Sequence, residues 1–200
     1  SLHDALPILA KRVATGQTPS HLWIDSKSST VYSTMQDSDE LIAVDLPTQT
    51  VKWRVKTGPM PADLIGTSDD KRILVALTGG DAVEVYDVSG PTVTRSKVIK
   101  TGLGAHAFRA LGDGRHVLVS NRVANTISKI DLQTLEVVGR FNVPGGPDCM
   151  DVTRDGKQLY VSSRWARKLS VMDLASGKLL RQVNVGKSPH GVWTLDHAPR

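Results

Sequence analysis

A repeat of about 42 residues runs along the chain, and it limits the folds that the sequence can adopt more than any other feature. Its first landmark is a turn of the Gly-x-x-Pro type, which occurs five times with two substitutions and ends at Pro19, Pro61, Ala105, Pro147 and Pro189. A second landmark is an aspartate that closes an apolar stretch, and it occurs at Asp45, Asp87, Asp131 and Asp173. Both series advance by 42, then 44, then 42 residues, and the first series advances by a further 42 to its fifth member. Repeats of this length are typical of stacked structural units such as propeller blades.

Each repeat contains four short segments rich in β-branched residues, separated by polar or glycine-containing turns. No segment shows a sustained helical period, so the sequence predicts essentially no helix. We therefore expect an all-β fold: a β-propeller fragment with four complete four-stranded antiparallel blades and part-blades at each end. The predicted blades cover residues 15–56, 57–100, 101–143 and 144–185, and residues 186–200 supply the first strand of a further blade. We refer to the four strands of a blade as a, b, c and d, in chain order.

Composition excludes several other classes of protein. No apolar run approaches the roughly 18–20 residues that a membrane span needs. The single cysteine, Cys149, rules out an intramolecular disulfide and a zinc site built on paired cysteines. Aromatic residues make up 4% of the chain, too few for an aromatic platform that stacks single-stranded nucleic acid.

The chain resembles the YVTN-type repeats of bacterial propellers and is similar to the YncE-like family. The segment RDGKQLYVSSRWARKLSVMDLASGKLLRQVNVGKSPHGV, residues 154–192, carries the resemblance most clearly, and the likeness covers residues 9–200. The resemblance implies a periplasmic or otherwise exported bacterial protein. It says little about activity, because this repeat family hosts several unrelated functions.

The two ends of the chain do not coincide with blade boundaries. Residues 9–16 align with the ends of the fourth strands of later repeats, whereas residues 1–8, SLHDALPI, fit no repeat position. This leader reads like a translated sequencing-adapter oligonucleotide, and we expect it to be non-native; an irregular natural N-terminus is the alternative. A closed propeller of this type needs roughly six to eight blades, so we expect the parent protein to be longer and to close as a monomer.

One residue in each repeat is predicted to lie at the mouth of the propeller channel. In a blade, strand a is innermost, and the residue directly after the Gly-x-x-Pro turn begins it. Successive repeats place Ser20, Ala62, His106, Asp148 and His190 there. Imidazole and carboxylate groups are ligands for zinc, copper or iron, so His106, Asp148 and His190 form a candidate metal site. A histidine there could also bind haem, as in the related d1-haem propellers; ordinary hydration of a wet channel is the other interpretation.

Two arginines are expected at the same mouth. Arg122 and Arg164 occupy equivalent positions, 42 residues apart, in the loops between strands b and c. The planar guanidinium group donates two hydrogen bonds at once to a carboxylate or phosphate, so these residues suggest a small anionic ligand. Solvated loop arginines are the alternative. The candidate ligand-binding residues are therefore His106, Arg122, Asp148, Arg164 and His190.

The remaining polar positions are assigned structural roles. The aspartates that close the third strands are expected to accept hydrogen bonds from backbone at the hairpin that follows, because a catalytic aspartate would single out one repeat. Cys149 is expected to be a small buried core thiol. A nucleophilic role would require a nearby base, and His106 or His190 could serve.

These features favour a non-catalytic scaffold that binds a ligand or a protein partner. The repeats are nearly uniform, and the chain shows neither the order of a catalytic triad nor a dense carboxylate cluster. The alternative is a metal- or d1-haem-associated propeller, either a cofactor carrier or a protein related to oxidoreductases. Nucleic-acid binding is a lesser alternative, because the net charge of +5 is not concentrated in a Lys/Arg tract.

Overall fold

The computed structural model describes residues 11–199, and within that range sixteen strands form four separate sheets. Each sheet contains four consecutive antiparallel strands, and the described residues include no helix. The prediction of an all-β propeller fragment with four complete blades is therefore confirmed. Blade 1 comprises β1 (Pro19–Ile24), β2 (Thr30–Met35), β3 (Glu40–Asp45) and β4 (Thr50–Lys56), and blade 2 comprises β5 (Pro61–Gly66), β6 (Arg72–Leu77), β7 (Ala82–Asp87) and β8 (Thr94–Lys100). Blade 3 comprises β9 (Ala105–Ala110), β10 (His116–Asn121), β11 (Thr126–Asp131) and β12 (Glu136–Asn142), and blade 4 comprises β13 (Pro147–Val152), β14 (Gln158–Ser163), β15 (Lys168–Asp173) and β16 (Leu179–Asn184).

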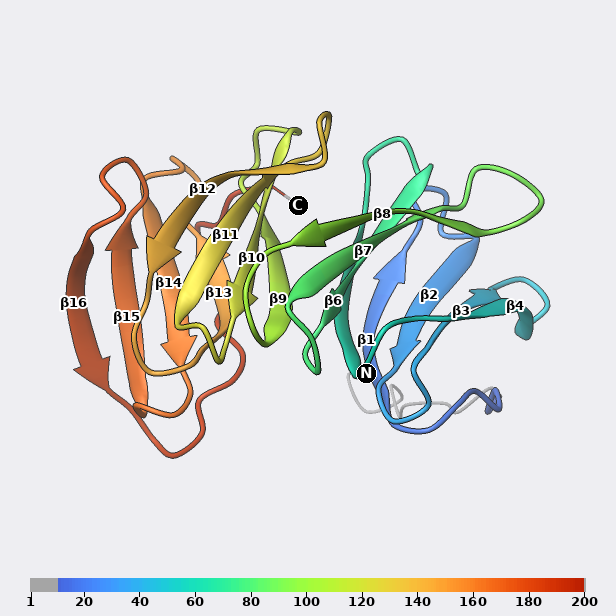
Figure 1. Cartoon of the computed structure of the whole chain (residues 1–200), viewed down its shortest axis with the longest axis horizontal. Coiled ribbons are helices and arrows are strands. Elements are labelled where there is room, and N and C mark those ends of the chain that lie inside the picture. Colours follow the sequence, from blue (N-terminus) through green and yellow to red (C-terminus); the bar gives the residue numbers. More distant parts are fainter. Residues whose placement is uncertain (1–10, 200) are drawn as a thin grey trace, which may run out of the picture.

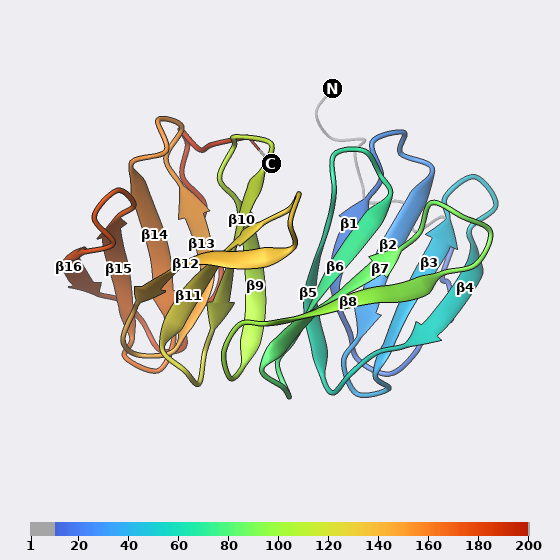
Figure 2. The ribbon, with the colours of Figure 1, turned by 45° about the horizontal axis from the view of Figure 1, so that its top comes forward.

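The four blades stand side by side along an arc. The a strands of neighbouring blades pack against one another, so β1 contacts β5, β5 contacts β9, and β9 contacts β13. The d strands β4 and β16 lie at the two far ends of the molecule (Figure 1), and β5 and β9 lie next to each other near its middle (Figure 2). Strands β4 and β12 alternate between exposed and half-buried residues, as expected for strands at the outer edge of a blade.

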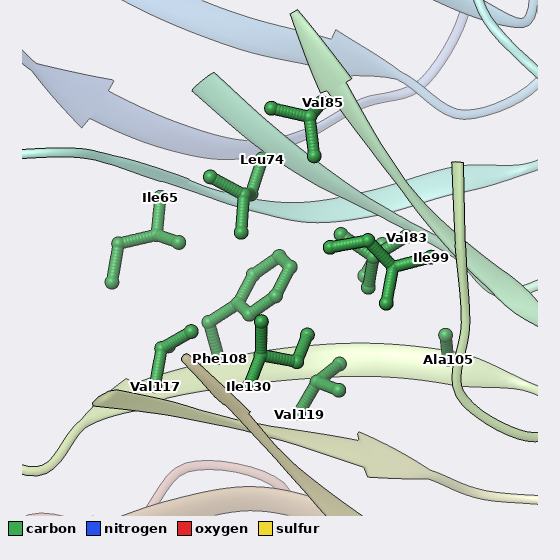
Figure 3. Packing of buried hydrophobic residues seen from close by; sticks show 11 residues of the cluster. Ile65, Leu74, Val83, Val85, Ile99, Ala105, Phe108, Val117, Val119 and Ile130 are labelled. Atoms are coloured by element: carbon green, nitrogen blue, oxygen red, sulfur yellow. The ribbon is translucent and has the colours of Figure 1, made fainter. Parts of the chain in front are cut away.

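The hydrophobic core lies between the blades rather than within them. The central strands bury both faces; in β6, for example, every residue after Arg72 is buried. Between blades 2 and 3, Phe108 lies in the middle of an apolar cluster, with Leu74 and Val83 on one side and Val117 and Ile130 on the other (Figure 3). Each fully buried aliphatic side chain of this kind stabilises the fold by about 1.5–3 kcal/mol. A sheet in this protein therefore depends on its neighbours for stability.

An irregular pairing recurs near the start of each a strand. The register between strands a and b shifts between Pro19 and Leu22, between Pro61 and Leu64, and between Pro147 and Met150. In blade 3 the same shift lies between Val119 and Asn121 of the b strand. A bulge of this kind leaves an extra residue in one strand and changes the direction in which neighbouring side chains point. The innermost residues of the propeller are therefore not arranged by simple strand alternation.

The repeated aspartates have the structural role that the sequence predicted. Asp45 accepts hydrogen bonds from the backbone N–H and the hydroxyl of Thr48, at 3.0 and 2.6 Å. Asp173 contacts Ser176 in the same way, at 2.7 and 2.5 Å. These bonds close the hairpins between strands c and d, and they hold the pKa of Asp45 and of Asp173 below its usual value.

The segment after β16 forms no strand of its own. The sequence predicts strand a of a further blade at residues 186–200, but the described part of this segment contains only one isolated bridge, between Thr153 and His197. The a strands of the four blades pair with a b strand of the same sheet, and no described residues could serve as that partner here. The segment instead runs back along β13, where Ala198 N donates to Val152 O at 2.8 Å. The predicted leader, residues 1–8, lies outside the described residues.

A buried ion pair connects blade 3, blade 4 and this last segment. Arg109 Nε lies 2.7 Å from Asp151 Oδ1, and the two side chains are only 3% and 1% exposed. Asp151 also accepts hydrogen bonds from the backbone N–H and hydroxyl of Thr194, at 2.7 and 2.8 Å. Arg109 donates to the carbonyl of Ala198. The charges of both residues are thus compensated inside the protein.

Removing one partner of this pair should strongly destabilise the chain. Asp151→Ala leaves the Arg109 guanidinium buried without its counter-ion, and we expect the free energy of unfolding to fall by about 3–5 kcal/mol. Asp196→Ala is a matched control, because Asp196 pairs with Arg154 at the surface, where the two side chains are 76% and 72% exposed; we expect a change within about 1 kcal/mol. Urea denaturation followed by tryptophan fluorescence measures both. Equal losses in the two variants would contradict the assigned role.

Candidate ligand site at the channel mouth

Asp148 is the centre of a polar cluster at the start of β13. Its side chain is fully buried. Arg122 Nη2 donates to Asp148 Oδ1 at 2.6 Å, and Arg164 Nη1 donates to Asp148 Oδ2 at 3.1 Å. His106 Nε2 lies 3.0 Å from Asp148 Oδ1. We call His106, Arg122, Asp148 and Arg164 the Asp148 cluster.

The topology explains why these residues meet. His106 and Asp148 begin the neighbouring a strands β9 and β13, which pack against each other. Arg122 and Arg164 directly follow the b strands β10 and β14, which are antiparallel to β9 and β13 and therefore end beside the points where those strands begin. The predicted convergence of strand a starts and b–c loops is thus observed for these four residues.

His106 is held by a short chain of hydrogen bonds. Thr78 Oγ1 donates to the carbonyl of Ala105 at 3.0 Å and lies 3.0 Å from His106 Nδ1. His106 Nε2 lies 2.6 Å from Arg122 Nη2 and 3.0 Å from Asp148 Oδ1, so it accepts from the guanidinium in one tautomer and donates to the carboxylate in the other. Thr78 occupies in blade 2 the position that Arg122 and Arg164 occupy in blades 3 and 4.

Burial and the neighbouring charges set the charge states of the cluster. Burial lowers the pKa of His106 to about 4, so this imidazole is neutral at physiological pH. Burial acts to raise the pKa of Asp148, but the contacts with His106 and Arg122 outweigh it and hold that pKa far below its usual range. The cluster therefore contains two guanidinium cations and one carboxylate.

A groove with a volume of about 320 Å³ runs along the inner strands beside this cluster. We call it the axial groove. Its walls come from β1, β5, β9 and β13 and from residues 190–192. Among the five predicted ligand residues, only His190 lines it. His106 and Asp148 are almost fully buried, at 4% and 0% exposure, which corrects the expectation that they face a wet channel.

Cys149 differs from its predicted core position. It is half-buried and lines the axial groove, and its Sγ lies 3.6 Å from His190 Nδ1. Burial, together with the negative charges of Asp148 and Asp63, raises the pKa of Cys149 to about 12. The thiol is therefore protonated at neutral pH and is a weak nucleophile.

His21, which the repeat register did not single out as a ligand residue, also lines the groove. The ring centroid of His21 lies 5.7 Å from that of His106 and 6.3 Å from that of His190. The repeat places His21 one residue after Ser20, so strand alternation turns it away from the mouth. The bulge between Pro19 and Leu22 changes that direction. The sequence did contain a signal for this residue, because His21 directly follows Ser20, the position that the repeat assigns to the mouth in blade 1.

The predicted metal ligands are near one another but are already engaged. One ligand atom from each of His106, Asp148 and His190 lies within 4.8 Å of the others. His106 and Asp148 both contact Arg122, and Asp148 also contacts Arg164, so a cation there would have to displace guanidinium groups. The same contacts occupy Nε2 of His106, the atom through which it would bind a haem iron, so His106 does not fit an axial haem ligand.

Comparison with protein families agrees with the β-propeller fold. The family model for a YNCE-like beta-propeller matches residues 3–200. The chain belongs to the YNCE-like β-propeller family. The match includes residues 3–8 of the predicted leader, which fit no repeat position.

Two solved structures are similar to this YNCE-like propeller. Kuenenia stuttgartiensis hydrazine synthase matches with a TM-score of 0.73 and 26% identity, over 88% of this chain and 51% of that one. The dihydro-heme d1 dehydrogenase NirN in complex with DHE matches with a TM-score of 0.69 and 19% identity, over 90% of this chain and 40% of that one. The propeller thus spans about half, or less, of the length of these structures. A comparison with curated proteins finds no match.

The buried neutral histidine predicts a loss of stability in mild acid. The pKa of His106 is about 4 in the folded chain and near 6.5 when unfolded, so between these values the unfolded state binds more protons. Stability should therefore fall as the pH decreases from about 6.5 towards 4, by up to roughly 3 kcal/mol.

The variant His106→Gln tests this dependence, because glutamine keeps a polar side chain but does not titrate. Urea denaturation at pH 7 and pH 5 should show a smaller difference for the variant than for the unmodified chain. The same pH dependence in both proteins would show that His106 is not the responsible group.

Proposed function

We propose that this chain is part of a non-catalytic binding propeller of the bacterial envelope, periplasmic or exported, whose channel mouth binds a small anion. The anion is either a free ligand or an acidic group presented by a protein partner. One observation carries the proposal: two guanidinium groups converge on one carboxylate, so the Asp148 cluster retains an unneutralised positive charge. The envelope location rests on the resemblance to exported bacterial propellers.

The arginines retain hydrogen-bond donors for such a ligand. Arg164 contacts Asp148 through one nitrogen, and its side chain is 34% exposed. Arg122 Nε is buried and has no hydrogen-bond partner among the described residues. Guanidinium groups bind carboxylates and phosphates with two parallel hydrogen bonds, which adds directional specificity to the charge attraction.

The groups at the mouth favour binding over chemistry. His106 is buried and its ring nitrogens are engaged by Thr78 and Arg122, so it is poorly placed to take a proton from a ligand. The raised pKa of Cys149 keeps the thiol protonated. In the described part of the chain, we find no helix that is long and apolar enough to cross a membrane.

The second candidate function is a cofactor-associated propeller. The proximity of ligand atoms from His106, Asp148 and His190 favours it, as does the likeness to a dihydro-heme d1 dehydrogenase. We rank this function second because His106 and Asp148 already contact arginines, which a metal ion would have to displace. Nucleic-acid binding ranks lower still, because Arg122 and Arg164 are directed at an internal carboxylate.

Anion binding is tested by isothermal titration of the chain with succinate and with inorganic phosphate. We expect binding that weakens with added salt. Arg164→Gln should reduce the affinity by about 10-fold or more, because it removes a charged hydrogen-bond donor. Arg181→Gln is the matched control, since it removes the same charge from an exposed position on β16.

The ligand should be recovered chemically unchanged after prolonged incubation, as measured by NMR. Binding of neither anion, or equal affinity in the Arg164→Gln and unmodified chains, would contradict the proposal. Conversion of the ligand would contradict the non-catalytic assignment.

A further inference from the structure

Three potential metal ligands meet on the wall of the axial groove, outside the Asp148 cluster. They are His21 from β1, Cys149 from β13 and His190 from the segment after β16. One ligand atom from each residue lies within 4.8 Å of the others. Cys149 Sγ lies 3.6 and 3.9 Å from the two ring nitrogens of His190. The rings of His21 and His190 are stacked with an interplanar angle of 21°.

We propose that His21, Cys149 and His190 bind a zinc-type divalent metal ion through two imidazole nitrogens and one thiolate. This donor set suits Zn²⁺, which takes nitrogen and sulfur ligands in tetrahedral geometry. Three protein ligands leave a fourth position of a tetrahedral ion for a water molecule or a small ligand. Because all three residues line the axial groove, such a ligand could reach the ion from the open volume of the groove.

Hydrogen bonds outside the three ligands already orient them. Ser20 Oγ lies 3.0 Å from His21 Nδ1, so an N–H at Nδ1 can donate to it and leave Nε2 free to bind metal. Ser162 Oγ lies 2.6 Å from the backbone carbonyl oxygen of His190 and 3.0 Å from that of Cys149, so its one hydroxyl hydrogen is shared between them. One serine therefore fixes the backbone of two of the three ligands.

The alternative ligand set, formed by His106 and Asp148 with His190, is less suited to a cation. Its members contact Arg122 and Arg164, and a metal ion there would face two guanidinium groups at close range. Both sets include His190, so one ion at a time can use it. The set containing Cys149 leaves the Asp148 cluster intact.

The charge around Cys149 favours a cation. The carboxylates of Asp148 and Asp63 act on the thiol more strongly than the guanidinium groups of Arg122 and Arg164 do. Asp148 Oδ1 lies 3.9 Å from Cys149 Sγ. Binding replaces the thiol proton by the metal: the S–H bond breaks, an S–metal bond forms, and one proton is released to solvent. No electron is transferred.

Cobalt(II) is the probe for this site, because it replaces zinc and its bond to a thiolate gives a charge-transfer absorption in the near ultraviolet. We expect the reduced chain to bind one Co²⁺ with this absorption, and the absorption to disappear when Zn²⁺ is added. Cys149→Ser should abolish the absorption. His21→Ala and His190→Ala should each weaken Zn²⁺ binding by at least about 10-fold, the lower range found when even an outer-shell partner is removed.

Two further variants, His116→Gln and His106→Gln, and a measurement of folding show whether the metal ion occupies the proposed site. His116→Gln is the matched histidine control, since His116 lies on β10 and pairs with Asp113, and it should bind metal like the unmodified chain. Far-ultraviolet circular dichroism confirms the fold of each variant. No charge-transfer absorption in the folded unmodified chain would overturn the proposal. So would metal binding that survives Cys149→Ser but is lost in His106→Gln, because the ion would then occupy the other set. The proposal uses neither arginine, so its outcome is independent of anion binding.

Discussion

The packing of one sheet against the next is the interaction on which the whole structure depends. Each blade has two apolar faces, and the clusters on these faces draw residues from consecutive blades, as around Phe108. A single four-stranded sheet with both faces exposed would leave its central strands in water, so the energy of burial is realised only when blades stand side by side. This stacking brings the a strands together, and both the axial groove and the Asp148 cluster form where they meet. The axial groove is lined by the four a strands together with residues 190–192.

Two groups of charged residues lie at different depths of this inner surface, and they differ in whether their charges balance. The Arg109–Asp151 pair is almost fully buried, and further hydrogen bonds from Thr194 and to Ala198 compensate it. At the mouth, Asp148 is equally buried but faces two arginines, one of which is partly exposed. The deeper pair is a balanced structural link between blades 3 and 4, whereas the Asp148 cluster has an excess of positive charge and open donors. That imbalance distinguishes a candidate binding site from a structural ion pair.

The two proposed ligand sites lie close together but use different chemistry. The arginines offer fixed, permanently charged donors suited to an anion. His21, Cys149 and His190 offer lone pairs and a thiolate suited to a borderline-soft metal ion. A metal ion on the wall of the axial groove would itself be a cation close to the Asp148 cluster, and its open position would face the same space. An anionic ligand that reached both sites would be attracted by the metal and by Arg164 together.

The sequence alone determined the fold, because the 42-residue spacing, the closing aspartates and the β-branched strands repeat in one register, and each repeat is a local pattern. It also placed His106, Arg122, Asp148 and Arg164 at one mouth, since these residues follow from the order of strands within a blade. Only the tertiary structure decided that His106 and Asp148 are buried in contacts with arginines, that Cys149 lines a groove, and that His21 joins it. Burial and contacts between blades depend on how neighbouring sheets pack. The bulge near Pro19 changes the direction of side chains by one residue, and periodicity cannot reveal it.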